Sequence, residues 1–223
     1  MSQDARIPPA VIQRATIALR QLERFQHQDI ATISSADLGF AIGASAAQVR
    51  KDLAHFGQLG KRGVGYHVAS LAATLRSILA LDREWPVALV GAGNLGRALC
   101  THRPFRHRGF RIVALFDADP RKIGCTWARL TVQPMRDLPR AVRQHHIALG
   151  IIAVPDAAAQ AVADLLVAAG LRGILNFAPT RVQVPEGVVV CSVDLAVELQ
   201  QLAYLAASLE PTPGGDDAAK PQS

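Results

Sequence analysis

One stretch decides the fold of this chain, and it reads Val87-Ala88-Leu89-Val90-Gly91-Ala92-Gly93-Asn94-Leu95-Gly96. Four apolar residues predict a short buried strand, which runs directly into a Gly-x-Gly-x-x-Gly loop and then into a helical segment. This order is the dinucleotide-binding fingerprint. Gly91 permits the tight turn, Gly93 lets the backbone approach a pyrophosphate, and Gly96 lets the helix pack closely on the strand. The helix N-terminus faces the phosphates.

The residues that follow strengthen this interpretation. Asp117 closes the second predicted strand, 21 residues after Gly96, where a carboxylate can bond a ribose hydroxyl and repel a 2′-phosphate. This favours NAD over NADP, although Arg121 and Lys122 lie close by and weaken the preference. The alternative for Asp117 is a helix N-cap before Pro120. The candidate cofactor residues are Gly91, Ala92, Gly93, Asn94, Leu95, Gly96, Asp117, Val154 and Pro155.

The second half of the chain alternates between strands and helices, which predicts a Rossmann-like parallel sheet. The strand candidates are residues 87–90, 112–116, 147–154, 173–176 and 188–190, with a helix over residues 157–169. Val154-Pro155 ends the third of these strands and is expected to line the ligand crevice; the alternative is an ordinary strand-to-helix turn. The last predicted helix, over residues 193–208, is too apolar for a solitary surface helix and needs a partner surface.

The first 84 residues predict a different kind of domain, a winged helix-turn-helix. Val11, Ala15, Ala18, Leu19 and Leu22 recur at helical spacing. A second helix, capped by Ser34 or Ser35, stops at Gly43, and Ser45 caps a third helix over residues 46–56. Val64, Tyr66 and Val68 alternate after a basic, Gly-rich stretch and predict a hairpin, the wing. A further helix follows over residues 71–81, and Pro86 marks the domain boundary.

The third helix carries side chains that suit DNA. Gln48, Arg50 and Lys51 are expected near each other on its exposed part, and Gln and Arg make bidentate bonds to base edges in the major groove. Lys61 and Arg62 at a hairpin tip suit phosphates or a minor groove. The alternative is a solvated charged helix beside a Gly-rich loop.

Composition excludes several classes of protein. Of the 223 residues, 50% are hydrophobic and 19% charged, and the net charge of +6 is divided equally between residues 1–84 and the remainder. A modest basic excess is compatible with nucleic acid without establishing it. Three scattered cysteines favour a reducing cytoplasm and no disulfides. Neither a signal peptide nor a membrane span is expected, and the seven histidines show no metal spacing. Residues 210–223 are expected to be a disordered tail.

Several segments together resemble the Rex family of redox-sensing transcriptional repressors. They are Ile33-Ser-Ser-Ala-Asp-Leu38, Gln48-Val-Arg-Lys-Asp-Leu53, Phe56-Gly57, Gly60-Lys-Arg-Gly-Val-Gly-Tyr66, Val90-Gly-Ala-Gly-Asn-Leu-Gly-Arg-Ala-Leu99, Phe116-Asp-Ala-Asp-Pro120, Lys122-Ile-Gly124, Ala159-Gln160, Gly173-Ile-Leu-Asn-Phe-Ala-Pro179 and Val193-Asp-Leu195. The resemblance runs from about Pro8 to Ser208. Its most specific parts are the segments from Gln48 to Tyr66 and from Gly173 to Pro179.

The resemblance implies an α/β homodimer with a winged-helix domain over residues 1–84 and a Rossmann NAD(H)-binding domain over residues 85–209. Its C-terminal helix is domain-swapped between subunits. Such repressors bind palindromic operator DNA when NADH is scarce and release it when NADH binds, whereas NAD⁺ competes weakly without causing release. The candidate DNA-binding residues are Ser45, Gln48, Arg50, Lys51, Lys61, Arg62 and Tyr66.

The resemblance also implies a switch, in which Arg20 on the first helix pairs with Asp194 at the start of the exchanged helix in the DNA-binding state. His102 stands where the family often has a Tyr that reports the nicotinamide state, so the resemblance does not extend to the fine mechanism of sensing. The alternative function is an NAD-dependent oxidoreductase with an appended helical domain. An enzyme would need an acid or base residue over the nicotinamide, and none stands out. The sequence therefore favours a cytoplasmic repressor that is not an enzyme and needs no metal.

Overall fold

The structure, a computed structural model, describes residues 7–60 and 64–209. The chain divides into two compact units, and the boundary falls between Glu84 and Trp85. Lys61, Arg62 and the C-terminal tail lie outside the described residues. Across the described ranges, none of the helices has the length and hydropathy that crossing a membrane requires.

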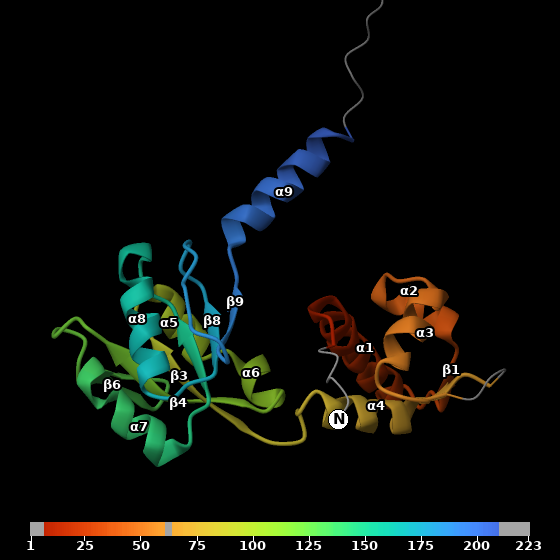
Figure 1. The fold of residues 1–223 in the computed structure, drawn as a ribbon, viewed down its shortest axis with the longest axis horizontal. Coiled ribbons are helices and arrows are strands. Elements are labelled where there is room, and N and C mark those ends of the chain that lie inside the picture. The colour runs from red at the N-terminus through yellow and green to blue at the C-terminus, as the bar shows by residue number, and fades with distance from the viewer. Residues whose placement is uncertain (1–6, 61–63, 210–223) are drawn as a thin grey trace, which may run out of the picture. The chain divides into compact units, whose positions relative to one another are not determined.

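The first unit is mostly helical. Its elements are α1 (Pro9–His27), β1 (Thr32–Ile33), α2 (Ser35–Ile42), α3 (Ala46–Ala54), β2 (Tyr66–His67) and α4 (Val68–Ile78) (Figure 1). The five apolar residues predicted to form the inner face of α1 are all buried. Four of them, Ala15, Ala18, Leu19 and Leu22, share one core with Leu38 of α2, Val49 and Leu53 of α3, and Leu71 and Leu75 of α4. An ion pair between Arg76 and Glu23 also links α4 to α1.

The helix-turn-helix forms because each of its ends carries a suitable cap. The Ser34 hydroxyl accepts a hydrogen bond from the Asp37 N–H at the start of α2, and the Ser45 hydroxyl accepts one from the Gln48 N–H at the start of α3, each 3.1 Å long. Between the helices Gly43 adopts a left-handed conformation, with a φ of 69°, which ends α2 after Ile42. The turn between the helices is short, as the sequence predicts.

The tip of the predicted wing, residues 61–63, lies outside the described residues. After it, Tyr66–His67 form a strand that pairs antiparallel with Thr32–Ile33, which precede α2. Val68 already belongs to α4. The alternation of Val64, Tyr66 and Val68 therefore reflects one short strand that runs into a helix, and the core beneath β1 takes up the Tyr66 ring.

The second unit is a seven-stranded sheet with the strand order β5-β6-β4-β3-β7-β8-β9. Every neighbouring pair is parallel except β5 and β6. The strands are β3 (Trp85–Val90), β4 (Phe110–Asp117), β5 (Thr126–Trp127), β6 (Leu130–Pro134), β7 (Leu149–Ile152), β8 (Gly173–Asn176) and β9 (Val189–Ser192). The helices are α5 (Asn94–Cys100), α6 (Arg103–His107), η1 (Met135–Asp137, a 3₁₀ turn), α7 (Leu138–His145), α8 (Asp156–Ala168) and α9 (Leu195–Ala207).

Strand β3 contributes to both cores of this unit, because successive side chains of a strand point to opposite faces. Ala88 and Val90 pack in the core that α7 and α8 cover. Val87 and Leu89 pack in the other core, with Leu99 of α5. Both faces of the sheet are therefore buried, as in doubly wound folds, and the predicted Rossmann-like class is correct.

Helix α9 is the exception to this packing. None of its residues is buried, although many are apolar. Leu199, Leu202 and Leu205, for example, are 66%, 61% and 60% exposed. In Figure 1 the helix, drawn in blue, extends away from the sheet. An apolar helix without a core of its own is expected to be covered by something outside this chain.

Candidate functional site

The glycine loop adopts the geometry that its sequence predicts. Gly91 has a φ of 108°, and a Cβ atom there would collide with the carbonyl oxygen of Ala153. A Cβ atom on Gly96 would collide with the carbonyl oxygen of Gly91, because α5 packs directly on the end of β3. At Gly93, by contrast, a Cβ atom would meet no heavy atom within 4 Å. Gly91 and Gly96 are therefore required by the fold, whereas Gly93 is required by nothing in the described chain.

The loop lies at the point where the strand order of the sheet reverses. From β3 the chain moves outward to β4 and β6, then returns to β7 on the other side of β3. Val154 follows β7, and one of its methyl groups would lie 3.0 Å from a Cβ atom on Gly91. Pro155 caps the start of α8 beside it. The carboxyl ends of β3 and β7 thus form the crevice where open α/β sheets bind ligands.

The other predicted residues of the loop differ in exposure. Ala92 is buried, whereas Asn94, the first residue of α5, and Leu95 are exposed. After α5 begins, the Arg97 guanidinium lies 4.6 Å from the centre of the Trp127 ring, which joins the β5 end of the sheet to this helix. The loop thus exposes the side chains of Asn94 and Leu95 and buries that of Ala92.

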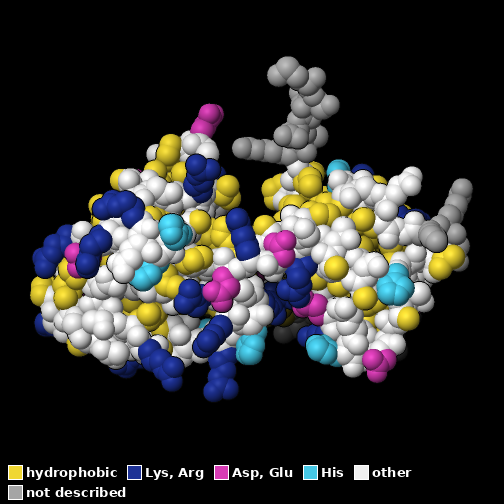
Figure 2. Space-filling view, turned by 90° about the horizontal axis from the view of Figure 1, so that it is seen from below, with side chains coloured by type: hydrophobic (Ala, Val, Ile, Leu, Met, Phe, Trp, Pro, Cys, Tyr) yellow, Lys and Arg dark blue, Asp and Glu magenta, His cyan; other side chains and the backbone are white. Residues whose placement is uncertain are grey.

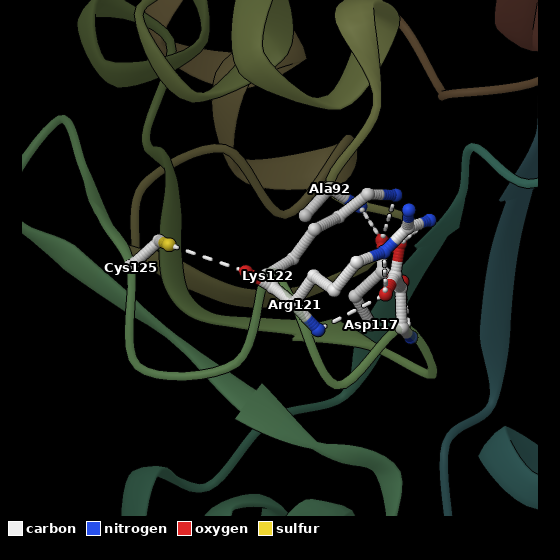
Figure 3. Close-up of polar contacts among 6 residues, drawn as sticks. Ala92, Asp117, Arg121, Lys122 and Cys125 are labelled. Carbon is white, nitrogen blue, oxygen red and sulfur yellow. Dashed lines mark hydrogen bonds and ion pairs between the residues drawn. The ribbon is translucent and has the colours of Figure 1, made fainter.

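Asp117 is the buried acid at the end of β4, and it binds the glycine loop directly (Figure 3). Its carboxylate accepts hydrogen bonds from the Ala92 N–H at 2.7 Å, the Asp119 N–H at 2.8 Å and the Lys122 ammonium at 3.0 Å. Burial raises the pKa of Asp117, but these three donors outweigh burial and hold the pKa below its usual value. The sequence predicted a ribose acceptor here and missed this structural role. No helix follows for Asp117 to cap.

The two cations near Asp117 are each paired with an acid. Lys122 pairs with Asp117, and Arg121 binds Asp119 through two nitrogens, at 3.0 and 2.9 Å. The Arg121 side chain lowers the pKa of Asp119 to about 2. The cluster therefore offers no net positive charge to a 2′-phosphate.

Asn176, which the sequence analysis did not single out, also shapes the crevice. It ends β8, is fully buried, and donates to the carbonyl oxygens of Ala178 at 3.3 Å and Thr180 at 2.7 Å. Its own carbonyl oxygen accepts from the Ala178 N–H at 3.0 Å. One side chain thus fixes the turn over residues 177–180, and only the position of Asn176 at a strand end could have indicated this.

The predicted DNA-binding residues of α3 have different partners. Lys51 is exposed, and Arg50 reaches across to the hydroxyl of Ser35 on α2, at 2.8 Å. Gln48 is half-buried and donates to the Asp52 carboxylate at 2.7 Å. Gln48 and Arg50 are thus each held by a different polar side chain of the first unit.

Two further predicted DNA contacts have structural roles. Ser45 is exposed, but its hydroxyl caps α3. Tyr66 is only 8% exposed, and its ring packs in the core of the first unit.

The three predicted switch residues are described within their own units. Arg20 is an exposed residue of α1. Asp194 caps α9, and its carboxylate accepts from the N–H groups of Ala196 and Val197 at 2.9 and 3.2 Å. His102 is exposed at the start of α6, with its ring edge-on to that of Phe105 at 4.9 Å.

On the face of the second unit seen in Figure 2, the basic side chains are not gathered into one stripe. Figure 2 shows Lys and Arg side chains spread over its visible face. Within residues 7–60 and 64–209, no group of three or more His, Cys, Asp or Glu side chains is arranged to hold a metal ion. The two features that bear on function are the capped helix-turn-helix of the first unit and the glycine loop at the switch point of the sheet.

These two features define a class of protein, the DNA-binding regulators that a dinucleotide controls. Comparisons with known proteins agree. Residues 6–54 match the family "Putative DNA-binding protein N-terminus", and residues 82–180 match "CoA binding domain". A redox-sensing transcriptional repressor Rex from Carboxydothermus hydrogenoformans is 50% identical over 89% of this chain and 96% of its own length. The Rex of Streptomyces coelicolor is 46% identical over 89% of this chain and 77% of its own length.

Solved structures give the same result. The chain superimposes on RSP in complex with β-NAD⁺ and operator DNA with a TM-score of 0.87, at 34% identity, over 92% of this chain and 94% of that one. For RSP in complex with β-NADH the TM-score is 0.82, at 33% identity, over 92% and 96%. The chain belongs to the Rex family of redox-sensing transcriptional repressors. Its named relatives are repressors, so the oxidoreductase alternative has no support among them.

Proposed function

We propose that this chain represses transcription by binding operator DNA through α3 and that NADH, bound in the crevice beside Gly91–Gly96, releases it. One observation carries the proposal. A single chain joins a capped helix-turn-helix to a dinucleotide crevice, and its solved relatives hold operator DNA with NAD⁺ in one case and NADH in another. The units are then a DNA-binding domain over residues 1–84 and an NAD(H)-binding domain over residues 85–209, in a cytoplasmic protein.

The assignment of residues follows from their positions. Arg50 and Lys51, on the exposed surface of α3, contact the DNA. Gln48 and the first turn of α3, which Ser45 caps, contact it as well. Lys61 and Arg62 are assigned from the sequence alone. The cofactor occupies the crevice, with its pyrophosphate at Gly93 and its adenosine ribose near Asp117, and Val154 and Pro155 form the opposite wall.

A second copy of this chain is the proposed partner of α9. The uncovered leucines of this helix support exchange between two subunits, which gives a homodimer and hence a palindromic operator. In such a dimer, Arg20 on α1 and Asp194 at the start of the exchanged helix α9 are the proposed switch pair. If they act as a pair, the losses of operator affinity in R20A and D194A are non-additive in the double variant. Fully additive losses would remove the pair from the mechanism.

The decisive experiment is an operator mobility shift titrated with NADH and, separately, with NAD⁺. The operator is first selected by the purified protein from a randomised duplex library. We expect NADH to release the DNA and NAD⁺ to compete with NADH without releasing it. Protein that selects no sequence, or DNA that NADH leaves bound, would contradict the proposed function.

A further inference from the structure

A partly buried ionic network lies beside the first turn of α3. Asp52 is 5% exposed, and it accepts two hydrogen bonds from the Arg14 guanidinium of α1, one from Nε at 2.5 Å and one from Nη2 at 2.8 Å. Its Oδ1 atom also accepts from the amide nitrogen of Gln48 at 2.7 Å. Arg14 and Asp52 are 38 positions apart in the sequence, and neither was a candidate for function.

The direction of the Gln48 side chain is unusual for its position. Ser45-x-x-Gln48 has the spacing of a capping box, in which the glutamine side chain would turn back to the N–H of the capping serine. Here the side chain instead turns forward by one helical turn to Asp52. The capping serine keeps its own bond to the Gln48 N–H. The network thus takes Gln48 away from a purely structural contact.

The network also fixes which way the Gln48 amide faces. A carboxylate accepts hydrogen bonds and cannot donate them, so only the NH₂ group of Gln48 can face Asp52. Flipping the amide would place its oxygen against a carboxylate oxygen. Arg14 keeps Asp52 ionised, since its hydrogen bonds are the main cause of the lowered pKa of this acid. One N–H and the amide oxygen of Gln48 remain available to a ligand.

We propose that Arg14 and Asp52 are positioning residues for DNA recognition, because they hold the Gln48 amide in the one orientation that reads adenine. Adenine presents an acceptor at N7 beside a donor at N6 in the major groove, which matches the free N–H and oxygen of the amide. Residues at the N-terminal end of a recognition helix are those that contact base edges. This inference rests on the proposed function, and it adds to it the base that Gln48 selects.

The pair has a second effect on binding. An unpaired carboxylate on the recognition helix would repel the DNA phosphates, and the Arg14 guanidinium cancels that charge at a distance of 2.5 Å. Arg14 therefore acts without touching the DNA, and its loss is expected to alter both the orientation of Gln48 and the charge beside it.

The test measures base preference and not affinity alone. A site selected from a randomised duplex library is changed one base pair at a time, and binding of each duplex is measured for the wild type, Q48A, D52N, R14K and the double variant Q48A/D52N. In D52N the new amide can both donate and accept, so it can hydrogen-bond the Gln48 amide in either orientation. R14K keeps the charge and loses the two-pronged contact. R24A, at an exposed arginine of the same helix α1, is the matched control.

We expect the wild type to prefer adenine at one position of each half-site by roughly 5- to 150-fold over other bases. In D52N this preference falls to near parity while preferences elsewhere remain, R14K is intermediate, and R24A is unchanged. Q48A/D52N discriminates no worse than Q48A alone. If D52N is unfolded by circular dichroism, R14K decides in the same way.

Three results would overturn the inference. In the first, D52N and R14K weaken all duplexes equally, which is the behaviour of a purely structural pair. In the second, Q48A retains the adenine preference. In the third, the base preferred at the position that Q48A alters is not adenine. Failure of the wild type to select any sequence is a different outcome: it refutes the proposed function itself, and the inference falls with it.

Discussion

Valine at position 93 should abolish the response to NADH and leave the fold intact. Gly93 has a φ of −92° and a ψ of −167°, an extended conformation that suits a β-branched residue. A Cβ atom there meets no protein atom within 4 Å. The added methyl groups would therefore occupy only the space through which a pyrophosphate approaches the backbone. G93V thus separates the requirement of the ligand from that of the fold.

The size of the effect follows from ligand linkage. At an NADH concentration one hundred times its Kd, binding stabilises the wild type by about 2.7 kcal/mol. For a domain of 150–250 residues each kcal/mol raises Tm by roughly 2–4 °C, so the wild type should gain about 5–10 °C. G93V should gain almost nothing. Without NADH, the free energies of unfolding of G93V and the wild type should agree to within about 0.5 kcal/mol.

Differential scanning fluorimetry with and without NADH measures both quantities. A98V, which places a valine at an exposed position of α5, should keep the full increase in Tm on addition of NADH. G96A should instead unfold at a lower temperature without any ligand, because its Cβ atom meets the Gly91 carbonyl oxygen. A full NADH-dependent shift in G93V would refute the assignment of the pyrophosphate to this loop. Destabilised G93V without ligand would refute the claim that the fold tolerates a side chain there.

Three further predictions concern other parts of the chain. Calorimetry should give much weaker binding of NADPH than of NADH, because Asp117 and its paired lysine present no net positive charge to a 2′-phosphate; equal affinities would contradict this. R14A should lower the free energy of unfolding at neutral pH, because it leaves the buried Asp52 carboxylate without its cation. Since the pKa of folded Asp52 is lowered, that stabilisation is present above about pH 4 and is lost as the pH falls below it, so acid unfolding curves of R14A and the wild type should converge. L199E should yield monomers in light scattering, whereas Q200E, at the next exposed position of α9, should remain dimeric; a dimeric L199E would exclude α9 from the interface.

Local patterns predicted the elements whose partners are close in sequence. The buried face of α1 and both helix caps were correct, because spacing and capping act within a few residues. The glycine loop was correct because its backbone needs glycines at fixed intervals. The parallel sheet followed from the alternation of strands and helices.

Features that depend on distant residues could not be read in the same way. The pairing of Tyr66 with Ile33 was not predicted, because Ile33 precedes two intervening helices. The β5–β6 hairpin was missed because β5 has only two residues and no clear alternation. Asp52 was not singled out, since its partner Arg14 lies 38 residues earlier. Pairing between distant residues is a property of the tertiary fold.

The bond between Asp117 and the Ala92 N–H limits how this protein could change its cofactor. Replacing the acid with a small or basic residue is the direct route toward accepting a 2′-phosphate. Here that route also removes the acceptor for the Ala92 N–H and the anion that holds Lys122. A variant changed only at Asp117 should therefore have a loosened glycine loop, and a second substitution would be needed to hold that loop in place. Evolution toward NADPH is thus expected to need at least two steps, with the compensating change preceding the change at Asp117.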